Sequence, residues 1–146
     1  VHASATVPID DDRFAFCGIK YVPEWKTFNE HCMEALKIAK QQNTLEEHID
    51  NSDEWIFLSC LPWMNFTALT NPHGGPDDCI PRISWGKLDN QGSNWTIPVS
   101  VQVHHALVDG IHVGKFYDAL TESIATGFKK GLRVGGTRVI QGLEGG

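Results

Sequence analysis

Apolar residues follow two different periods in the first part of the chain. Residues 1–7 and 14–21 indicate two short strands, and the acidic run at residues 10–12 between them is typical of a turn. From Trp25 the spacing becomes that of a helix with one apolar face. The chain is therefore expected to begin with a β-hairpin and an amphipathic helix, whose inner face would hold Trp25, Phe28, Cys32, Ala35, Leu36 and Ala39.

Further apolar runs fill the middle of the chain. Residues 55–64 are apolar at nearly every position, which predicts a strand covered on both faces, and Pro62 should end it. Residues 80–88 predict another strand, and the polar run at residues 89–94 indicates a turn. Residues 96–105 then predict the strand that follows this turn.

The strand expected at residues 96–105 ends in two adjacent histidines. Side chains alternate across a sheet, so His105 would share the apolar face with the valines of this strand, away from bulk water, and His104 would lie on the opposite face. The helix predicted next has one apolar side, formed by Val113, Phe116, Leu120 and Ile124.

Strands and helices alternate along the chain, which predicts an α/β fold with a sheet and a layer of helices. The length of 146 residues suits one domain of ordinary size. We assign that domain to residues 1–128. Residues 129–146 are rich in glycine and are expected to form a frayed tail or to lie outside the domain.

Composition narrows the class of protein. Apolar residues make up 41% of the chain, enough for a core, and no apolar run approaches the length of a membrane span. The formal charge of −6 argues against nucleic acid or an anionic membrane as the main partner. The four cysteines show no C-x-x-C spacing, so we expect buried, reduced thiols in a soluble cytoplasmic protein.

Two kinds of site compete for the histidine-rich segment. A zinc site could use His104, His105 and His112, but neighbouring strand residues point to opposite faces, and neither H-E-x-x-H nor a cysteine pair is present, so no metal is expected. A serine hydrolase would need a G-x-S-x-G turn, which the sequence lacks. The spacing of His105 and Asp109 at a strand-to-helix turn still favours a chemical role over a purely structural one.

Three motifs in one order carry a family resemblance. HHALVDG at residues 104–110 matches the H-H-x-x-x-D-G signature of chloramphenicol acetyltransferases, and versions of it occur in dihydrolipoamide acyltransferases and condensation domains. SCLPWMNF at residues 59–66 resembles their S-x-x-P-W-x-x-F segment. PRISWGK at residues 81–87 and the run 88–120 continue the likeness. The chain therefore resembles the C-terminal portion of the family over about residues 1–124, which implies a two-layer α/β sandwich with a mixed sheet.

The resemblance implies a reaction. His105 would be the general base that takes the proton from a hydroxyl of a small-molecule acceptor, and this hydroxyl would attack the thioester of acetyl-CoA directly. Burial on the valine face would hold its imidazole neutral. Ser59 would donate a hydrogen bond to the oxyanion. Ser84 stands where the family has a threonine that contributes, through a water molecule, in the transition state.

Other positions are assigned through the same resemblance. Asp109 would pair with an arginine and hold the catalytic turn in shape, and Lys87 would contact CoA. Phe14 and Leu69 would line the acceptor pocket. His104 and His112 are expected to support the fold.

The match departs from the family in three respects. The arginine partner of Asp109 lies in an N-terminal part of the family that precedes Val1, so that part of the fold is expected to be missing and one sheet edge to be bare. Leu69 and Asn71 stand near positions where the family carries an aromatic and an aliphatic residue, and Leu88 replaces a tyrosine that packs on adenine. These changes bear on the acceptor and on CoA affinity more than on acyl transfer.

The combined expectation is an O-acetyltransferase for chloramphenicol or a related hydroxyl compound, an activity that confers antibiotic resistance. The family forms trimers with the active site between subunits, so a homotrimer is expected for the complete protein. Two alternatives remain open: a degenerate or truncated relative without catalysis, and an enzyme that resembles dihydrolipoamide acyltransferases and uses a lipoyl thiol.

Overall fold

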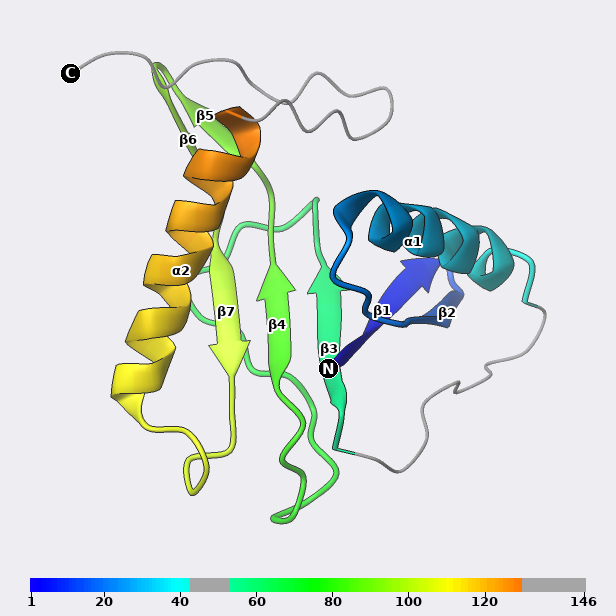
Figure 1. Ribbon diagram of the computed structural model, residues 1–146, viewed down its shortest axis with the longest axis horizontal. Helices are drawn as coiled ribbons and strands as arrows, with labels where there is room; N and C mark the ends of the chain where they lie inside the picture. The colour runs from blue at the N-terminus through cyan, green and yellow to red at the C-terminus, as the bar shows by residue number, and fades with distance from the viewer. Residues whose placement is uncertain (43–52, 130–146) are drawn as a thin grey trace.

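The computed structural model describes residues 1–42 and 53–129. Figure 1 shows two helices beside a sheet, with a small separate hairpin. The elements in chain order are β1 (His2–Pro8), β2 (Phe14–Ile19), α1 (Trp25–Ala39), β3 (Trp55–Cys60), β4 (Arg82–Trp85), β5 (Asp89–Gln91), β6 (Asn94–Thr96), β7 (Val99–Gln102) and α2 (Gly110–Lys129).

The main sheet is mixed. Its five strands lie in the order β2-β1-β3-β4-β7. The pairs β1–β3 and β3–β4 are parallel, whereas β1–β2 and β4–β7 are antiparallel. The expected N-terminal hairpin is therefore confirmed as β1–β2, and the expected α/β class is confirmed as well.

The helix α1 covers one face of the β1–β2 end of the sheet (Figure 1). Its first turn is capped by Glu24, whose carboxylate accepts hydrogen bonds from the amides of Lys26 and Thr27. The predicted inner face is confirmed except at Trp25, which is 51% exposed. The buried core beneath it consists of Ala3, Val7, Ala15, Cys17, Ile19 and Ala39.

The central strand β3 differs from its expected form. It ends at Cys60, before Pro62, as the proline predicted. It is not covered on both faces: Ile56 and Leu58 pack toward the core, but the alternate residues Phe57 and Ser59 border an open cavity. The reason is that α1 covers one face of the sheet and a loop crosses only part of the other.

The segment after β4 was also predicted in part incorrectly. Residues 89–94, expected as a turn, form β5 and the turn into β6, a two-stranded hairpin that bends at Gly92, where φ is +79°. The strand expected at residues 80–88 is confined to β4. Pro98, which has no amide hydrogen to donate, separates β6 from β7.

The strand β7 ends three residues before His105, which corrects the expected position of this histidine. Beyond Gln102 the chain turns, and the carbonyl of His104 accepts hydrogen bonds from the amides of Leu107 and Val108, both at 3.0 Å. The strand alternation therefore stops before it reaches His105, which is exposed rather than buried on the valine face.

The helix α2 lies alongside β7 (Figure 1), and Tyr117 Oη donates to the carbonyl of Val99 at 3.0 Å. The predicted apolar side of α2 is half-buried except at Ile124, which is 45% exposed. Neither helix in the described ranges has the length and apolar character that a membrane span requires. The expected glycine-rich tail falls almost entirely on residues 130–146, outside the described residues.

The four cysteines are free thiols. Cys17 is buried, and this burial raises its thiol pKa above the ordinary value. Cys32 and Cys79 are half-buried, whereas Cys60 is exposed at the end of β3, so the expectation of buried thiols is wrong for Cys60.

Gly86 permits a close approach between the end of β4 and the loop before it. A Cβ at this position would lie 2.5 Å from the carbonyl oxygen of Met64 and 2.8 Å from Cγ of Pro98. Gly86→Ala should therefore lower the free energy of unfolding by about 1–3 kcal/mol, measured by urea denaturation. Gly114→Ala is the matched control: it lies within α2 with open space around its Cβ position, so it should be neutral or stabilising by up to about 1 kcal/mol. Equal effects of both variants would contradict the prediction.

Candidate active site

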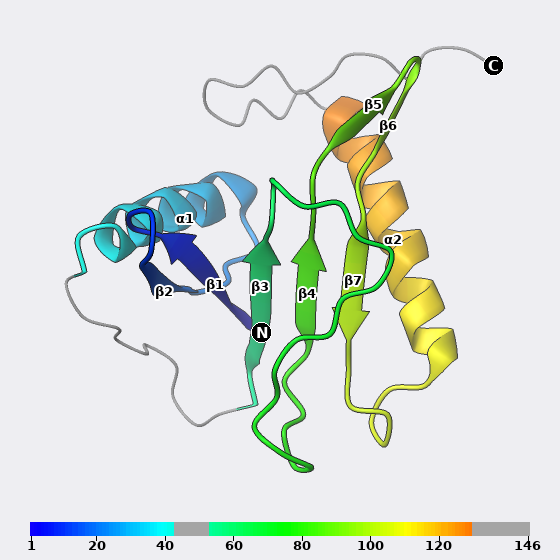
Figure 2. The same cartoon turned by 180° about the vertical axis from the view of Figure 1, so that it is seen from behind.

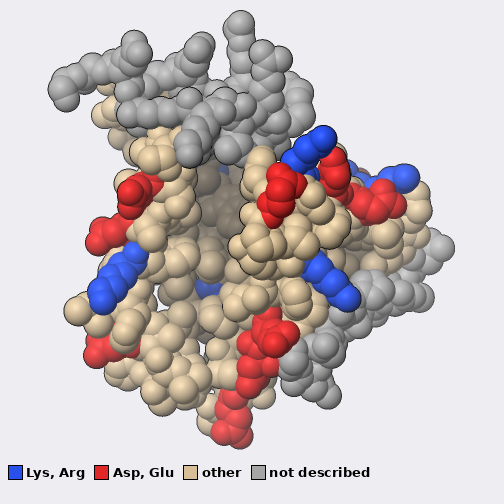
Figure 3. Space-filling model, in the orientation of Figure 1, with Lys and Arg blue, Asp and Glu red and all other residues tan. Residues whose placement is uncertain are grey.

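An open cavity of about 510 Å³ lies on the sheet face opposite α1. Side chains alternate along β1, so Ala3 and Val7 enter the core under α1 while Ser4 and Thr6 reach the cavity. The floor continues across β3 and β4. The charged side chains drawn on the other face are scattered, and no continuous basic area is visible among the described residues there (Figure 3).

Two serines form the polar part of the floor. Ser59 of β3 and Ser84 of β4 are register partners in neighbouring parallel strands. Two positions earlier in both strands, Phe57 stands beside Arg82. Ser84 is only 1% exposed, so its hydroxyl lies at the back of the cavity, where solvent competes little for its hydrogen bonds.

Aromatic side chains form one wall of the cavity. Phe14 and Phe16 of β2 meet edge to face, with ring centroids 5.7 Å apart. Together with Phe57 they give the cavity an apolar side next to the serine floor. Such a combination suits a small ligand with a ring at one end and polar groups at the other.

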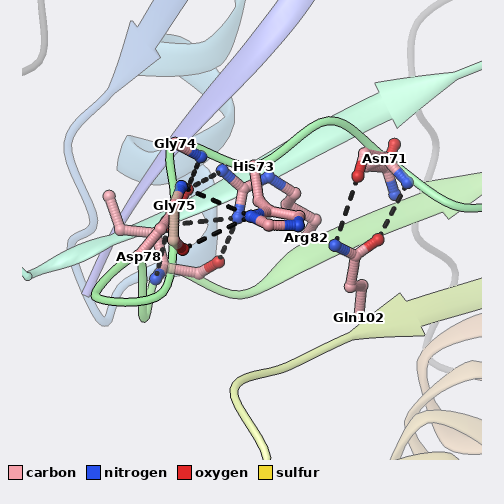
Figure 4. Close-up of polar contacts among 8 residues, drawn as sticks. Asn71, His73, Gly74, Gly75, Asp78, Arg82 and Gln102 are labelled. Carbon is pink, nitrogen blue, oxygen red and sulfur yellow. Dashed lines mark hydrogen bonds and ion pairs between the residues drawn. The ribbon is translucent and has the colours of Figure 1, made fainter.

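The long loop between β3 and β4 closes one side of the cavity. Seen from behind, it crosses in front of β4 and β7 (Figure 2). Ser100 Oγ donates to the carbonyl of Leu69 at 3.1 Å. The backbone of Asn71 forms two hydrogen bonds with the side chain of Gln102. The backbone amide of Asn71 donates to Oε1 at 2.8 Å, and its backbone carbonyl accepts from Nε2 at 3.2 Å (Figure 4). Ser84 Oγ donates to Asn71 Oδ1 at 3.1 Å.

An ion pair fixes the far end of the same loop. The guanidinium of Arg82 donates to both carboxylate oxygens of Asp78, at 2.5 and 3.2 Å, and both side chains are largely buried. The amide of Gly74 also donates to Asp78, at 2.7 Å. These bonds lower the pKa of Asp78 from 3.8 to about 2, with Arg82 the largest cause. The guanidinium lies 5.2 Å from the ring centroid of Phe57.

The structure gathers some of the expected site residues and separates others. Phe14, Ser59 and Ser84 line the cavity together. The lining of the cavity does not include His105, Asp109, Lys87 or Leu69. The expected base and the expected oxyanion donor therefore do not meet within one copy of the chain.

The turn that carries His105 lies against the loop rather than in the cavity. His104 is half-buried and its Nε2 lies 2.9 Å from the carbonyl of Pro76, to which it donates. Asp109 Oδ1 accepts from the amide of Ile111 at 3.4 Å, and the amide of Asp109 donates to Nδ1 of His112 at 3.2 Å, so both side chains cap the start of α2. Within residues 1–42 and 53–129, no arginine forms an ion pair with Asp109.

Sequence reasoning missed the Arg82–Asp78 pair and the cavity position of His73. The signal for Arg82 was its place two residues before Ser84 on one strand, which puts both on the same face. The sequence marks Asn71 as a departure from the family pattern but does not reveal its contact with Ser84. No group of three possible metal ligands occurs among the described residues.

The lowered pKa of Asp78 predicts acid-sensitive stability. Because the carboxylate has a lower pKa in the folded state, its contribution is present above about pH 4 and is lost as the pH falls toward about 2. It should amount to about 2 kcal/mol of unfolding free energy. Asp78→Asn should lose this amount at neutral pH and should lose less stability than wild type as the pH falls from about 4 to about 2, measured by urea denaturation at several pH values. The exposed neighbour Asp77→Asn should behave as wild type; an acid loss in Asp78→Asn as large as in wild type would contradict the assignment.

Comparisons with known proteins agree with the motifs. The family model of chloramphenicol acetyltransferase matches residues 2–121. Chloramphenicol acetyltransferase 3 of Escherichia coli is 37% identical over 87 residues, which are 59% of this chain and 38% of that protein. A chloramphenicol acetyltransferase of Clostridium perfringens is 27% identical over 114 residues, 77% of this chain and 52% of that protein. The chain thus spans about a third to a half of the length of such relatives.

Solved structures show the same fold. A chloramphenicol acetyltransferase superposes with a TM-score of 0.69 at 20% identity, covering 81% of this chain and 58% of the other. A dihydrolipoamide acetyltransferase of Azotobacter vinelandii superposes with a TM-score of 0.60 at 18% identity, covering 86% and 54%. The expected acyltransferase fold is therefore confirmed, and the chain belongs to the chloramphenicol acetyltransferase family.

Proposed function

We propose that the protein is a CoA-dependent O-acetyltransferase that transfers the acetyl group of acetyl-CoA to a hydroxyl of chloramphenicol or a related small molecule. The observation that carries the proposal is the cavity itself, where Ser59 and Ser84 face an aromatic wall. The family match supplies the reaction class. In a cell the enzyme would act in the cytoplasm, where acetyl-CoA is available.

The proposed base is His105. Its imidazole would take the proton of the acceptor hydroxyl as the oxygen attacks the thioester carbonyl, a role typically worth about 10²–10⁴-fold in rate. Collapse of the tetrahedral intermediate would break the carbon–sulfur bond, and the imidazolium would return its proton to the CoA thiolate. Because the acetyl group passes directly to the acceptor, no covalent acyl-enzyme forms.

The position of His105 supports an active site shared between subunits. His105 is exposed and outside its own cavity, so it would serve the cavity of a neighbouring copy in a homotrimer. Leu107 and Ile111, which flank the turn, are 67% and 63% exposed, and such apolar surface suits packing against another subunit. Asp109 and His112 would support this arrangement by fixing the turn at the start of α2.

The remaining roles complete the mechanism. Ser59 would donate to the oxyanion of the intermediate, Phe14 and Leu69 would form part of the acceptor site, and Ser84 would bind the acceptor or a water beside it. Lys87, just beyond β4, would attract a phosphate of CoA. Its amide donates to the carbonyl of Met64 at 2.6 Å, which fixes the backbone from which that side chain extends.

The direct test is a thiol-release assay with acetyl-CoA and chloramphenicol on the longest natural chain that contains these residues. His105→Ala should abolish release, because no proton acceptor would remain at the reacting hydroxyl. His31→Ala is the matched control, since His31 is an exposed histidine on α1, which covers the sheet face opposite the cavity, and its loss should leave release unchanged.

The other outcomes separate the alternatives. Release that persists in His105→Ala would remove His105 from the mechanism. No release with chloramphenicol but release with dihydrolipoamide would favour a thiol acceptor. A folded chain that neither binds CoA nor releases thiol would overturn the proposal in favour of a non-catalytic relative.

Ser59→Ala should lower kcat by about 10²–10³-fold with little change in the KM for acetyl-CoA, because the hydrogen bond is used mainly in the transition state. Steady-state kinetics with both substrates check this. Ser93→Ala, in the exposed turn between β5 and β6, is the control and should keep wild-type values. A rise in KM at unchanged kcat would instead assign Ser59 to ground-state binding.

A further inference from the structure

A row of polar side chains joins β7 and the residues after it to the loop between β3 and β4. Ser100, Gln102 and His104 are spaced by two positions, and each bonds the backbone of that loop. Ser100 donates to the carbonyl of Leu69, and Gln102 holds the backbone amide and carbonyl of Asn71 (Figure 4). His104 is the last member of the row, and the proposed base follows it directly in the chain.

The hydrogen bond of His104 has a single direction. Its Nε2 lies 2.9 Å from the carbonyl oxygen of Pro76, and a carbonyl oxygen only accepts, so Nε2 carries the proton. Turning the ring over would place a carbon against this oxygen and lose the bond. The other ring nitrogen, Nδ1, is buried and meets no partner within residues 1–42 and 53–129, so a proton there would be an unsatisfied donor. Both nitrogens therefore indicate the same tautomer.

The backbone of His104 shapes the turn that presents His105. The carbonyl of His104 accepts hydrogen bonds from the amides of Leu107 and Val108, both at 3.0 Å. One residue thus bonds the turn through its carbonyl and the loop through its imidazole. The loop is the same one that closes one side of the cavity, so His104 stands between the cavity wall and the proposed base.

We propose that His104 is a positioning residue, which ties the turn that carries His105 to the loop beside the cavity through the carbonyl of Pro76. The loop and the turn then keep their places together or lose them together. The effect on the rate of acetyl transfer rests on the proposed function, in which His105 is the base. The existence of the tie does not, because it is a property of the free protein.

Two measurements on the longest natural chain test the tie without a substrate. NMR of the ring nitrogens of His104 should find the proton on Nε2 rather than on Nδ1. Hydrogen exchange followed by mass spectrometry should show faster exchange in the turn peptide, residues 104–110, when His104→Leu removes the bond to Pro76. About tenfold is the usual scale for one hydrogen bond.

Matched variants identify the cause of this faster exchange. His104→Gln should restore most of the protection, because the Nε2 amide of glutamine can donate to the same carbonyl. His31→Leu makes the same chemical change at an exposed position on α1, on the other side of the sheet, and should leave exchange in the turn peptide as in wild type. If His104→Leu does not fold, His104→Ala takes its place.

Loosening the loop at its other end tests whether the turn depends on the loop. Asp78 lies two residues beyond Pro76, and Asp78→Asn removes the charge that pairs with Arg82. Exchange in the turn peptide should rise in Asp78→Asn. It should rise no further when Asp78→Asn is added to His104→Leu, because the tie is already lost. The exposed neighbour Asp77→Asn is the control and should leave exchange unchanged.

The rate of thiol release gives a separate readout. His104→Leu should lower kcat about 10- to 100-fold with little change in the KM for acetyl-CoA, because a displaced base reacts poorly although the cofactor still binds. His104→Gln should recover most of the loss, and His31→Leu should keep the wild-type kcat. A merely structural role would lower only the folded fraction, which circular dichroism measures, and leave the kcat of the folded protein unchanged.

The results separate this inference from the proposed function. A proton on Nδ1, unchanged exchange in His104→Leu, no recovery in His104→Gln, or additive effects of His104→Leu and Asp78→Asn overturns the inference. A wild-type kcat in folded His104→Leu also overturns it. If the wild-type protein releases no thiol from acetyl-CoA, the proposed acetyl transfer fails, while the tautomer and the exchange rates still support or overturn the tie.

Discussion

The pair of hydrogen bonds between Asn71 and Gln102 holds the loop that closes one side of the cavity. It holds the loop between β3 and β4 against β7, and the neighbouring bond from Ser100 to Leu69 supports it. Without these contacts the polar side chains of β4 and β7 would face solvent, and only the aromatic wall would remain beside the serine floor. The opposite end of the loop is held by the largely buried Asp78–Arg82 pair, in which removal of either partner would leave the other charge buried and uncompensated.

The local elements could be predicted from the sequence because their causes are local. The spacing of apolar residues distinguishes the strands β1 and β2 from the helix α1, and Pro62 stands just beyond the end of β3. The ends of the strands were harder to predict from the sequence. The end of β7 at Gln102 depends on where its partner β4 stops pairing, and no pattern within residues 96–105 contains that information.

The residues of the site likewise divide into those that could be predicted from the sequence and those that could not. Ser59 and Ser84 could be found because they belong to recognisable motifs, and parallel pairing then brings them together. The position of His105 could not be found, since the inference of burial depended on a strand that stops before it. Asn71 was missed as a site residue because its partner Gln102, 31 positions away, becomes its neighbour only through the path of the loop. Arg82 and Asp78 are only four positions apart, so the signal for their ion pair was present in the sequence.

The long reach of the Asn71–Gln102 contact also determines when the cavity can form during folding. The two residues are 31 positions apart in the chain, so the contact closes a large loop and carries its entropic cost. The β1–β2 hairpin and α1 rely on contacts of much shorter range and can form early. The cavity is complete only once β7 has paired with β4, so a small molecule that occupies it binds the finished fold and none of the earlier intermediates.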